Sequence, residues 1–333
     1  MQILLYSVIL IIGFILLIKG ADFFVDSSSS IARRARISPL VIGLTLVAFG
    51  TSLPELAVSF AASISAAQQG LTADIALGNV VGSNIANITL ILGMSALMMP
   101  ILVQKSMNKT EFPFLIGITF VIALLASYFQ SDMMITRFEA LILLLLFAFY
   151  MYLMFKGSKN LEDYPIDIKE LPVKLATLLL IVGLLGVSLG GFMVTRGAEF
   201  IATILLVDGL NMSLTKATTL VGLSIVSLGT SLPELVTSVV AAKKGENQIA
   251  MGNIVGSNIF NTLLIVGLSG VVTPLGVNRD VRNDLWFVLA LTVLVVIFSI
   301  HKQTITKLKG GILVLIYVSY IVFIIIRALA IVS

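Results

Sequence analysis

Charge and cysteine are both scarce in this chain. Only 11% of its 333 residues are Asp, Glu, Lys or Arg, 58% are hydrophobic, and none is cysteine. Soluble domains carry about 25% charged residues, so this composition excludes an ordinary soluble protein. The lack of cysteine excludes disulfides, thiolate metal sites and cysteine nucleophiles. No nucleophile–base pairing or phosphate-binding loop is recognisable, so we expect no enzyme, no cofactor and no nucleic-acid partner.

Long apolar segments dominate the sequence. The mean hydropathy is +1.10, and runs near the ~20 residues that cross a bilayer recur along the chain. They predict an all-α polytopic membrane protein surrounded by the lipid bilayer. The ten expected transmembrane helices cover residues 3–27, 38–67, 71–98, 112–130, 134–156, 173–204, 213–242, 246–272, 284–300 and 310–331.

The first apolar segment and the loop charges bear on orientation. This segment could be a signal peptide, but it lacks a basic stretch before its apolar run and has a counterpart in the second half, so we predict a retained helix. One set of alternate loops holds fourteen Lys and Arg residues and the other holds five. Because basic loops stay in the cytoplasm, we predict a multi-pass cell-membrane protein with both termini outside.

The two halves of the chain repeat one another. Residues 43–60 and 222–239 are identical at eleven of eighteen positions, and residues 78–93 and 252–267 at eleven of sixteen. Shared Gly, Thr, Ser, Pro, Glu and Asn at fixed spacing argue against a match through apolar composition alone. Five expected spans in each half mean that the second half is inverted relative to the first.

This repeat predicts the domain organisation. We expect a first inverted repeat over residues 1–156, a short cytoplasmic linker over 157–172 and a second inverted repeat over 173–333. Inverted repeats with helices broken near the membrane midplane are typical of secondary transporters.

A proline and a glutamate interrupt one apolar span in each half. The motif GTSLPE ends at Glu55 in the first half and at Glu234 in the second. Proline removes a backbone donor and clashes with the preceding turn, so each span is expected to unwind there and to expose carbonyls such as that of Ala48. A charged residue inside a membrane span marks an ion or proton pathway by default. Alternatively, Ser52 and Glu55 form only a capping box at the start of a half-helix.

A second repeated motif, GSNIxN, supplies further polar groups. Ser83 and Asn87 are four residues apart and share a helix face, and Ser257 and Asn261 repeat the spacing. Together the motifs offer carboxylate, amide, hydroxyl and carbonyl oxygens, without sulfur or imidazole. Such donors suit hard Ca²⁺ and similar ions, whereas softer metals prefer thiolate and imidazole.

Other polar residues have simpler interpretations. Asn84 and Asn258 of the second motif could join neighbouring helices by hydrogen bonds. The single histidine, His301, falls in a predicted cytoplasmic loop, where we expect it to be solvated.

GTSLPE and GSNIxN, each present twice in inverted halves, resemble the two alpha-repeats of the sodium/calcium exchanger family, within the cation/calcium exchanger superfamily. The layout most resembles the compact prokaryotic members, because the central loop is too short for the regulatory insert of animal exchangers. The resemblance implies four cation sites at the midplane, with Glu55 and Glu234 as the shared carboxylates that hold Ca²⁺. It assigns side-chain or backbone oxygens to Thr51, Ser52, Thr230 and Ser231, carbonyl oxygens to Ala48 and Ser227, completion of the Na⁺ sites to Ser83 and Ser257, and positions beside the centre to Asn87 and Asn261.

The resemblance also implies a mechanism. Na⁺ and Ca²⁺ compete for one set of oxygens while the first and sixth spans slide against the remaining core, and Lys19 and Arg196 on those spans are expected to be interfacial anchors. Potassium-dependent relatives carry Asp where this chain has Asn261, so we expect no K⁺ dependence.

Three functions stay open on the sequence. The favoured one is Na⁺-driven Ca²⁺ antiport by alternating access, with three Na⁺ per Ca²⁺. The alternative is Ca²⁺/H⁺ antiport, or another counter-ion, at the same two glutamates. The third, a passive channel or receptor, fits poorly with an enclosed site between inverted repeats. The expected partners are Ca²⁺, Na⁺ and lipid, and no obligate protein partner is evident.

Overall fold

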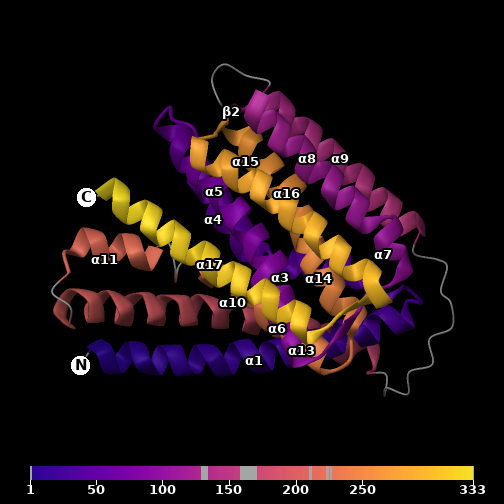
Figure 1. Cartoon of the computed structure of the whole chain (residues 1–333). Helices are drawn as coiled ribbons and strands as arrows, with labels where there is room; N and C mark the ends of the chain where they lie inside the picture. Colours follow the sequence, from indigo (N-terminus) through magenta and orange to yellow (C-terminus); the bar gives the residue numbers. More distant parts are fainter. Residues whose placement is uncertain are drawn as a thin grey trace.

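Helices make up nearly all of the described chain (Figure 1). This computed structural model describes residues 2–128, 134–157, 171–209, 212–222, 225 and 227–332. The helices of the first half are α1 (Gln2–Arg34), α2 (Pro39–Ile42), α3 (Ala48–Thr51), α4 (Leu53–Gln68), α5 (Asp74–Ala86), α6 (Leu92–Met98), α7 (Lys105–Lys109), α8 (Glu111–Tyr128) and α9 (Arg137–Gly157). Those of the second half are α10 (Val173–Ile204), α11 (Leu214–Val221), α12 (Ser227–Gly229), α13 (Leu232–Lys243), α14 (Asn247–Ile259), α15 (Val266–Val272), α16 (Arg279–Ile300) and α17 (Lys307–Val332).

The helices long and apolar enough to cross a membrane match the predicted spans closely. Within the described residues there are eight such helices, and a ninth span if the bent pair Pro39–Thr51 and Leu53–Gln68 is counted. The missing tenth is the predicted span 213–242, which includes residues outside the described part of the chain, as does most of the predicted linker. The polytopic helical fold is therefore confirmed.

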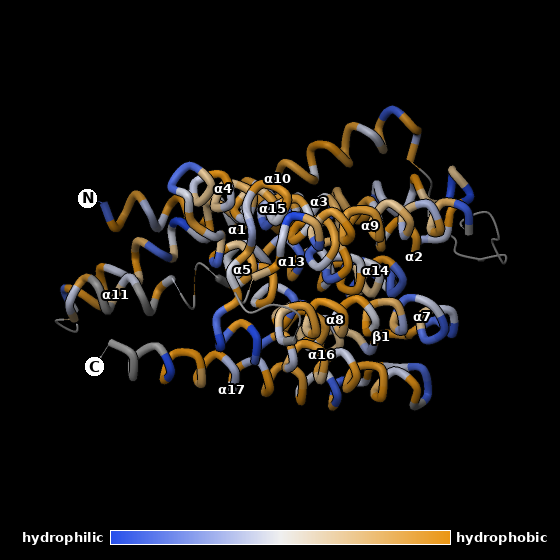
Figure 2. The backbone as a smooth tube through the Cα atoms, turned by 90° about the horizontal axis from the view of Figure 1, so that it is seen from above, coloured by the Kyte–Doolittle hydropathy of each residue, from blue (hydrophilic) through white to orange (hydrophobic). Residues whose placement is uncertain are grey.

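Two of these spans form the centre of the protein. In the most apolar window of Asp74–Met98, 78% of the residues are buried, and in that of Asn247–Val272, 83%, against 17–44% in the other unbroken spans. Figure 2 shows hydrophobic residues along the outer helices α9 and α17, where apolar side chains such as Leu145 and Leu315 are more than 60% exposed. Such exposure is what a surface facing lipid tails requires.

The first helices of the two halves lie side by side and run antiparallel (Figure 1). Gly13 of α1 faces the segment around Gly190 of α10, whereas Gly20 faces the segment around Gly183. A Cβ atom added to Gly20 would lie 2.6 Å from the backbone nitrogen of Val187. The two backbones thus touch because glycine has no side chain, as at small-residue contacts in membranes.

Within the described residues, two short antiparallel ladders connect the halves, and neither was predicted from the sequence. β1 (Ile101–Leu102) pairs with β4 (Thr304–Ile305), and β2 (Met134–Ile135) pairs with β3 (Leu275–Gly276). β1 and β3 follow the central spans of their halves, while β2 and β4 precede the last spans. Each ladder therefore pairs non-equivalent strands from opposite halves, and the exchange is reciprocal, as related halves would give.

Among the elements whose bounds the described residues give, four are π-helical turns that interrupt longer helices. They are η1 (Gly43–Val47), η2 (Asn87–Ile91), η3 (Leu205–Gly209) and η5 (Phe260–Ile265). Asn87 opens η2, and Asn261, its counterpart in the repeat, lies in η5. Single π-turns are frequent at functional sites, since they rotate the side chains that follow.

Candidate cation site

The glutamates of the two GTSLPE motifs start two half-helices inside the protein. Ser52 is the N-cap of α4 and Ser231 is the N-cap of α13, and each helix has its proline in the first turn. Pro54 has no N–H for the carbonyl of Gly50 four residues earlier, so the helix breaks, and the two pieces meet at a bend of 49°. Glu55 and Glu234 then lie in the first turns of their half-helices, each only 1% exposed.

Each glutamate is bonded by a serine of the other half. Ser231 Oγ donates to Glu55 Oε1 at 3.1 Å, and Ser52 Oγ donates to Glu234 Oε1 at 2.8 Å. Neither serine side chain caps its own helix, and the Ser52 N–H bonds to the Ala48 carbonyl at 3.0 Å. The capping-box interpretation of Ser52 and Glu55 is therefore wrong: these side chains join the two halves at the centre.

Oxygens without a hydrogen-bond partner gather on the same residues. Within the described chain, fourteen buried side-chain polar atoms lack a partner. Six belong to the predicted cation ligands: Glu55 Oε2, Glu234 Oε2, Ser257 Oγ, Thr230 Oγ1, Asn87 Oδ1 and Asn261 Oδ1. Most buried polar groups in proteins are paired, so a group of unpaired oxygens is a candidate for cation binding.

The remaining predicted residues take different places. Ser231 Oγ lies 3.2 Å from Ser83 Oγ, so Ser83 lies where the two halves of the chain meet. Thr51 Oγ1 bonds the Val47 carbonyl at 3.1 Å and lies 3.0 Å from Asn253 Oδ1. The Ala48 carbonyl is not freed by the break, because it keeps the bond from Ser52.

The second half differs slightly at the corresponding carbonyl. The Ser231 N–H donates to the carbonyl of Leu228, three residues earlier, at 3.2 Å. The carbonyl of Ser227 therefore does not accept the bond that the carbonyl of its counterpart, Ala48, accepts from Ser52. Ser227 opens α12, and its side chain lies outside the described part.

Two asparagines for which no role was predicted hold the half-helices by hydrogen bonds. Asn79 Nδ2 donates to Ser59 Oγ at 3.0 Å, and Asn253 Nδ2 donates to Ser238 Oγ at 2.9 Å. The bonds tie α4 to α5 and α13 to α14 in the same way. The available signal was the residue after Gly in GNVVGSN and GNIVGSN, which is asparagine in both halves.

Comparison with known proteins identifies the family. The family model described as sodium/calcium exchanger protein matches residues 5–156 and 175–326. This chain belongs to the sodium/calcium exchanger family. It is 36% identical over 329 residues to a protein of Alkalimonas amylolytica named as a candidate antiporter, CaxA, covering 95% of this chain and 98% of that protein. It is 32% identical to the sodium/calcium exchanger MaX1 of Methanosarcina acetivorans, covering 94% and 97%.

The fold agrees with a solved member of the family. The sodium-calcium exchanger NCX_Mj, in a structure soaked with zero Na⁺ and Ca²⁺, superimposes with a TM-score of 0.80 at 30% identity, covering 97% of this chain and 99% of that one. The chain is therefore a membrane antiporter of the exchanger family, as the repeated motifs predicted.

The chemistry of the site suits this family's cations. Among the described residues there is no group of three or more His, Cys, Asp or Glu side chains that could hold a metal. A cation bound beside the unpaired oxygens would meet two carboxylates and several neutral oxygens. Ca²⁺ accepts carboxylate, amide and carbonyl oxygens in irregular geometry, so these residues fit it as a transported substrate.

The two basic residues on the antiparallel pair lie outside the site. Lys19 is exposed. Arg196 pairs with Glu199 on its own helix at 3.1 Å and lies over the ring of Phe192. Neither is bonded to a predicted ligand, in keeping with their interpretation as interfacial anchors.

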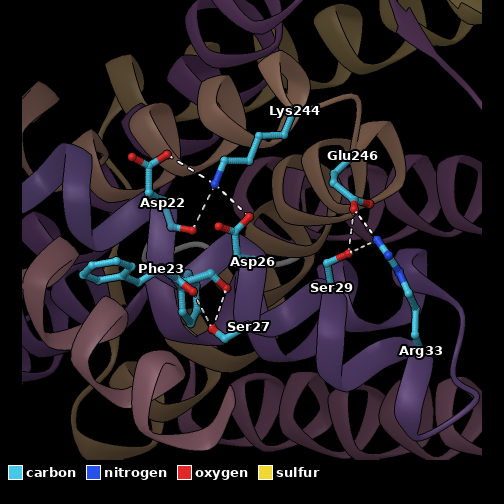
Figure 3. Close-up of polar contacts among 9 residues, drawn as sticks. Asp22, Phe23, Asp26, Ser27, Ser29, Arg33, Lys244 and Glu246 are labelled. Atoms are coloured by element: carbon cyan, nitrogen blue, oxygen red, sulfur yellow. Dashed lines mark hydrogen bonds and ion pairs between the residues drawn. The ribbon is translucent and has the colours of Figure 1, made fainter. Parts of the chain in front are cut away.

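A polar junction fastens α1 to the start of α14 (Figure 3). Lys244 pairs with Asp26 at 2.8 Å and with Asp22 at 3.3 Å. Arg33 pairs with Glu246 at 2.6 Å, and Ser29 Oγ donates to the same carboxylate oxygen at 2.6 Å. The Arg33–Glu246 pair is less exposed than the pairs of Lys244: the side chains of Arg33 and Glu246 are 18% and 9% exposed.

Proposed function

We propose that this protein exchanges Na⁺ for Ca²⁺ at one site centred on Glu55 and Glu234. The observation that carries the proposal is the pair of buried carboxylates whose Oε2 atoms have no partner within the described chain. A buried carboxylate is costly unless an opposite charge meets it. Each Oε1 atom accepts a hydrogen bond from an uncharged serine hydroxyl, so we assign the compensating charge to the transported cations.

The stoichiometry follows from the charges of the site and the family resemblance. With both glutamates ionised and Asn87 and Asn261 neutral, the site carries about two negative charges, which one Ca²⁺ balances. Three Na⁺, the number that the family resemblance implies, leave it about one charge positive. Each cycle then moves one net charge, worth roughly 2.3 kcal/mol per 100 mV, so a negative cell interior favours Na⁺ entry and Ca²⁺ exit.

Alternating access uses the two halves as inverted repeats, residues 1–156 and 173–333, around the fixed site. The α1–α10 pair is the moving unit in this proposal. Its backbone-to-backbone contact at Gly20 and Gly183 lets the two helices travel together. The excess of Lys and Arg in one set of alternate loops favours an orientation with both termini on the outer side of the cell membrane.

Ca²⁺/H⁺ antiport is the second candidate. Both glutamates can take a proton in place of Na⁺, and the serine hydroxyls that bond their Oε1 atoms can bond either form. The two candidates differ in the ion that displaces Ca²⁺: Na⁺ at constant pH for the first, and protons for the second.

Binding to the purified protein tests the proposal. In detergent at fixed pH, radioactive Ca²⁺ should bind, and Na⁺ should displace it steeply while choline should not. Glu55→Gln should remove the binding. Saturable Ca²⁺ binding that persists in Glu55→Gln would contradict the site. Release of Ca²⁺ when the pH is lowered in a second titration, without release by Na⁺ at fixed pH, would favour the second candidate.

A further inference from the structure

Asn261 poses a problem that a carboxylate would not. An amide has an acceptor end and a donor end, and only the oxygen can face a cation. Asn261 is 1% exposed and its Oδ1 has no partner among the described residues. If its amide turned over, an N–H₂ group would point where the oxygen now points. Something must fix the direction of this side chain.

A chain of two hydrogen bonds supplies that direction. Asn261 Nδ2 donates to Asn84 Oδ1 at 3.1 Å. Asn84 Nδ2 in turn donates to Thr262 Oγ1 at 3.0 Å. All three residues are 5% exposed or less, so water does not compete for these bonds.

We propose that Asn84 and Thr262 are positioning residues that hold the Asn261 amide with its oxygen available to the transported cation. Thr262 engages the nitrogen of Asn84, which leaves the Asn84 oxygen for the nitrogen of Asn261. The Asn261 oxygen then stays free. The proposal rests on the cation site described above and adds a residue pair that acts through Asn261 without touching the ion.

The other half lacks this chain, which provides an internal comparison. Thr262 corresponds to Ile88, and Asn84 corresponds to Asn258. Ile88 has no hydroxyl, and Asn258 Nδ2 bonds to the Ile254 carbonyl of its own helix at 2.6 Å. The Asn261 amide is therefore oriented by Asn84 of the opposite half. Its counterpart, Asn87, is not oriented in the same way, because Asn258 bonds within its own helix.

Thr262→Val tests the positioning role, with Thr262→Ser keeping the hydroxyl and Ile88→Val as the packing control in the equivalent position. Exchange in vesicles would be measured against the concentrations of Ca²⁺ and Na⁺. Losing one buried hydrogen bond amounts to about 1–3 kcal/mol, so Thr262→Val should raise the half-saturating concentration of at least one ion about tenfold. The maximal rate should stay within about twofold, and the other two variants should match the unaltered protein.

The outcomes separate this inference from the site itself. Unchanged half-saturation for both ions in Thr262→Val, or equal loss in Thr262→Ser, would overturn the positioning role. A fall in maximal rate alone would also overturn it, because a misdirected ligand changes affinity. If Glu55→Gln likewise left both affinities unchanged, the proposed site would fail; if Glu55→Gln abolished binding, only the positioning role would fail.

Discussion

Ser52 and Glu234 come from opposite halves of the chain, 182 residues apart, and their side chains are joined by a hydrogen bond of 2.8 Å. The equivalent residues of the repeat, Ser231 and Glu55, form the reciprocal bond at 3.1 Å. Each half-helix therefore begins with a serine that donates a hydrogen bond to the glutamate of the other half. The centre of the protein cannot form from one repeat alone.

Removing a crossing serine should weaken cation binding without unfolding the protein. Ser52→Ala removes the hydroxyl that donates to Glu234 Oε1, and hydrogen bonds to charged groups contribute about 1.5–3 kcal/mol. We expect Ca²⁺ affinity to fall about tenfold or more, measured by titration calorimetry. Ser63→Ala is the matched control, because this buried serine of the same helix bonds only the Ser59 carbonyl. Equal losses in both variants would contradict a specific role for Ser52.

Neutralising either glutamate should abolish Ca²⁺ transport. Two unit charges at 4 Å interact by roughly 4 kcal/mol at an effective dielectric constant of 20, so losing one carboxylate should lower Ca²⁺ affinity at least about 100-fold. Glu55→Gln and Glu234→Gln should still fold, since an amide is cheaper to bury than a carboxylate. Size-exclusion profiles and thermal unfolding would check the fold, and Ca²⁺ uptake would check the activity. Normal uptake by either variant would remove the basis for the site.

The spans could be predicted from the sequence because they depend on local pattern, and the repeated motifs marked candidate ligands that stay a prediction. Apolar length and loop charge locate helices, and identical motifs in two halves mark Glu55 and Glu234. The sequence left the partner of Ser52 open for a physical reason. A capping box within residues 52–55 and a bond to the opposite half use the same side chains, and only the packing of the halves decides between them.

Other features had weaker signals or none. The π-turns that contain Asn87 and Asn261 were not predicted from the sequence. The pairing of α1 with α10 could have been anticipated, since Gly13 and Gly20 recur at the seven-residue spacing also found between Gly183 and Gly190. Small residues at helical spacing indicate close helix contact in membranes.

Potassium should be neither required nor transported. Asn261 supplies an amide and no third carboxylate, so the site lacks the charge to balance another monovalent cation. Exchange should proceed equally well when K⁺ is replaced by choline on both sides of the vesicle. Asn261→Asp adds a charge at that position, and K⁺ or proton sensitivity appearing in that variant would place the residue in the site. A K⁺ requirement in the unaltered protein would refute the prediction.

The ion pairs that fasten α1 should contribute unequally to its stability. Lys244 and Asp26 are 29% and 56% exposed, and exposed pairs contribute about 0–1 kcal/mol. Breaking the more buried Arg33–Glu246 pair leaves a charge without its partner and costs more. Hydrogen exchange at residues 27–34 should therefore accelerate more in Glu246→Gln than in Lys244→Ala, with Lys243→Ala as the charge-matched control. The reverse order would show that the exposed pair holds the helix.

The direct test of the central claim is Ca²⁺ uptake into vesicles that contain the purified protein, compared under a Na⁺ gradient and under a pH gradient. Vesicles loaded with Na⁺ should take up Ca²⁺ at constant pH, and those loaded with choline should not. Exchange of three Na⁺ for one Ca²⁺ moves one positive charge outward per cycle, so valinomycin with high external K⁺, which makes the interior positive, should accelerate uptake. Uptake that is driven by a pH gradient in the absence of Na⁺, and is indifferent to a Na⁺ gradient, would contradict the account.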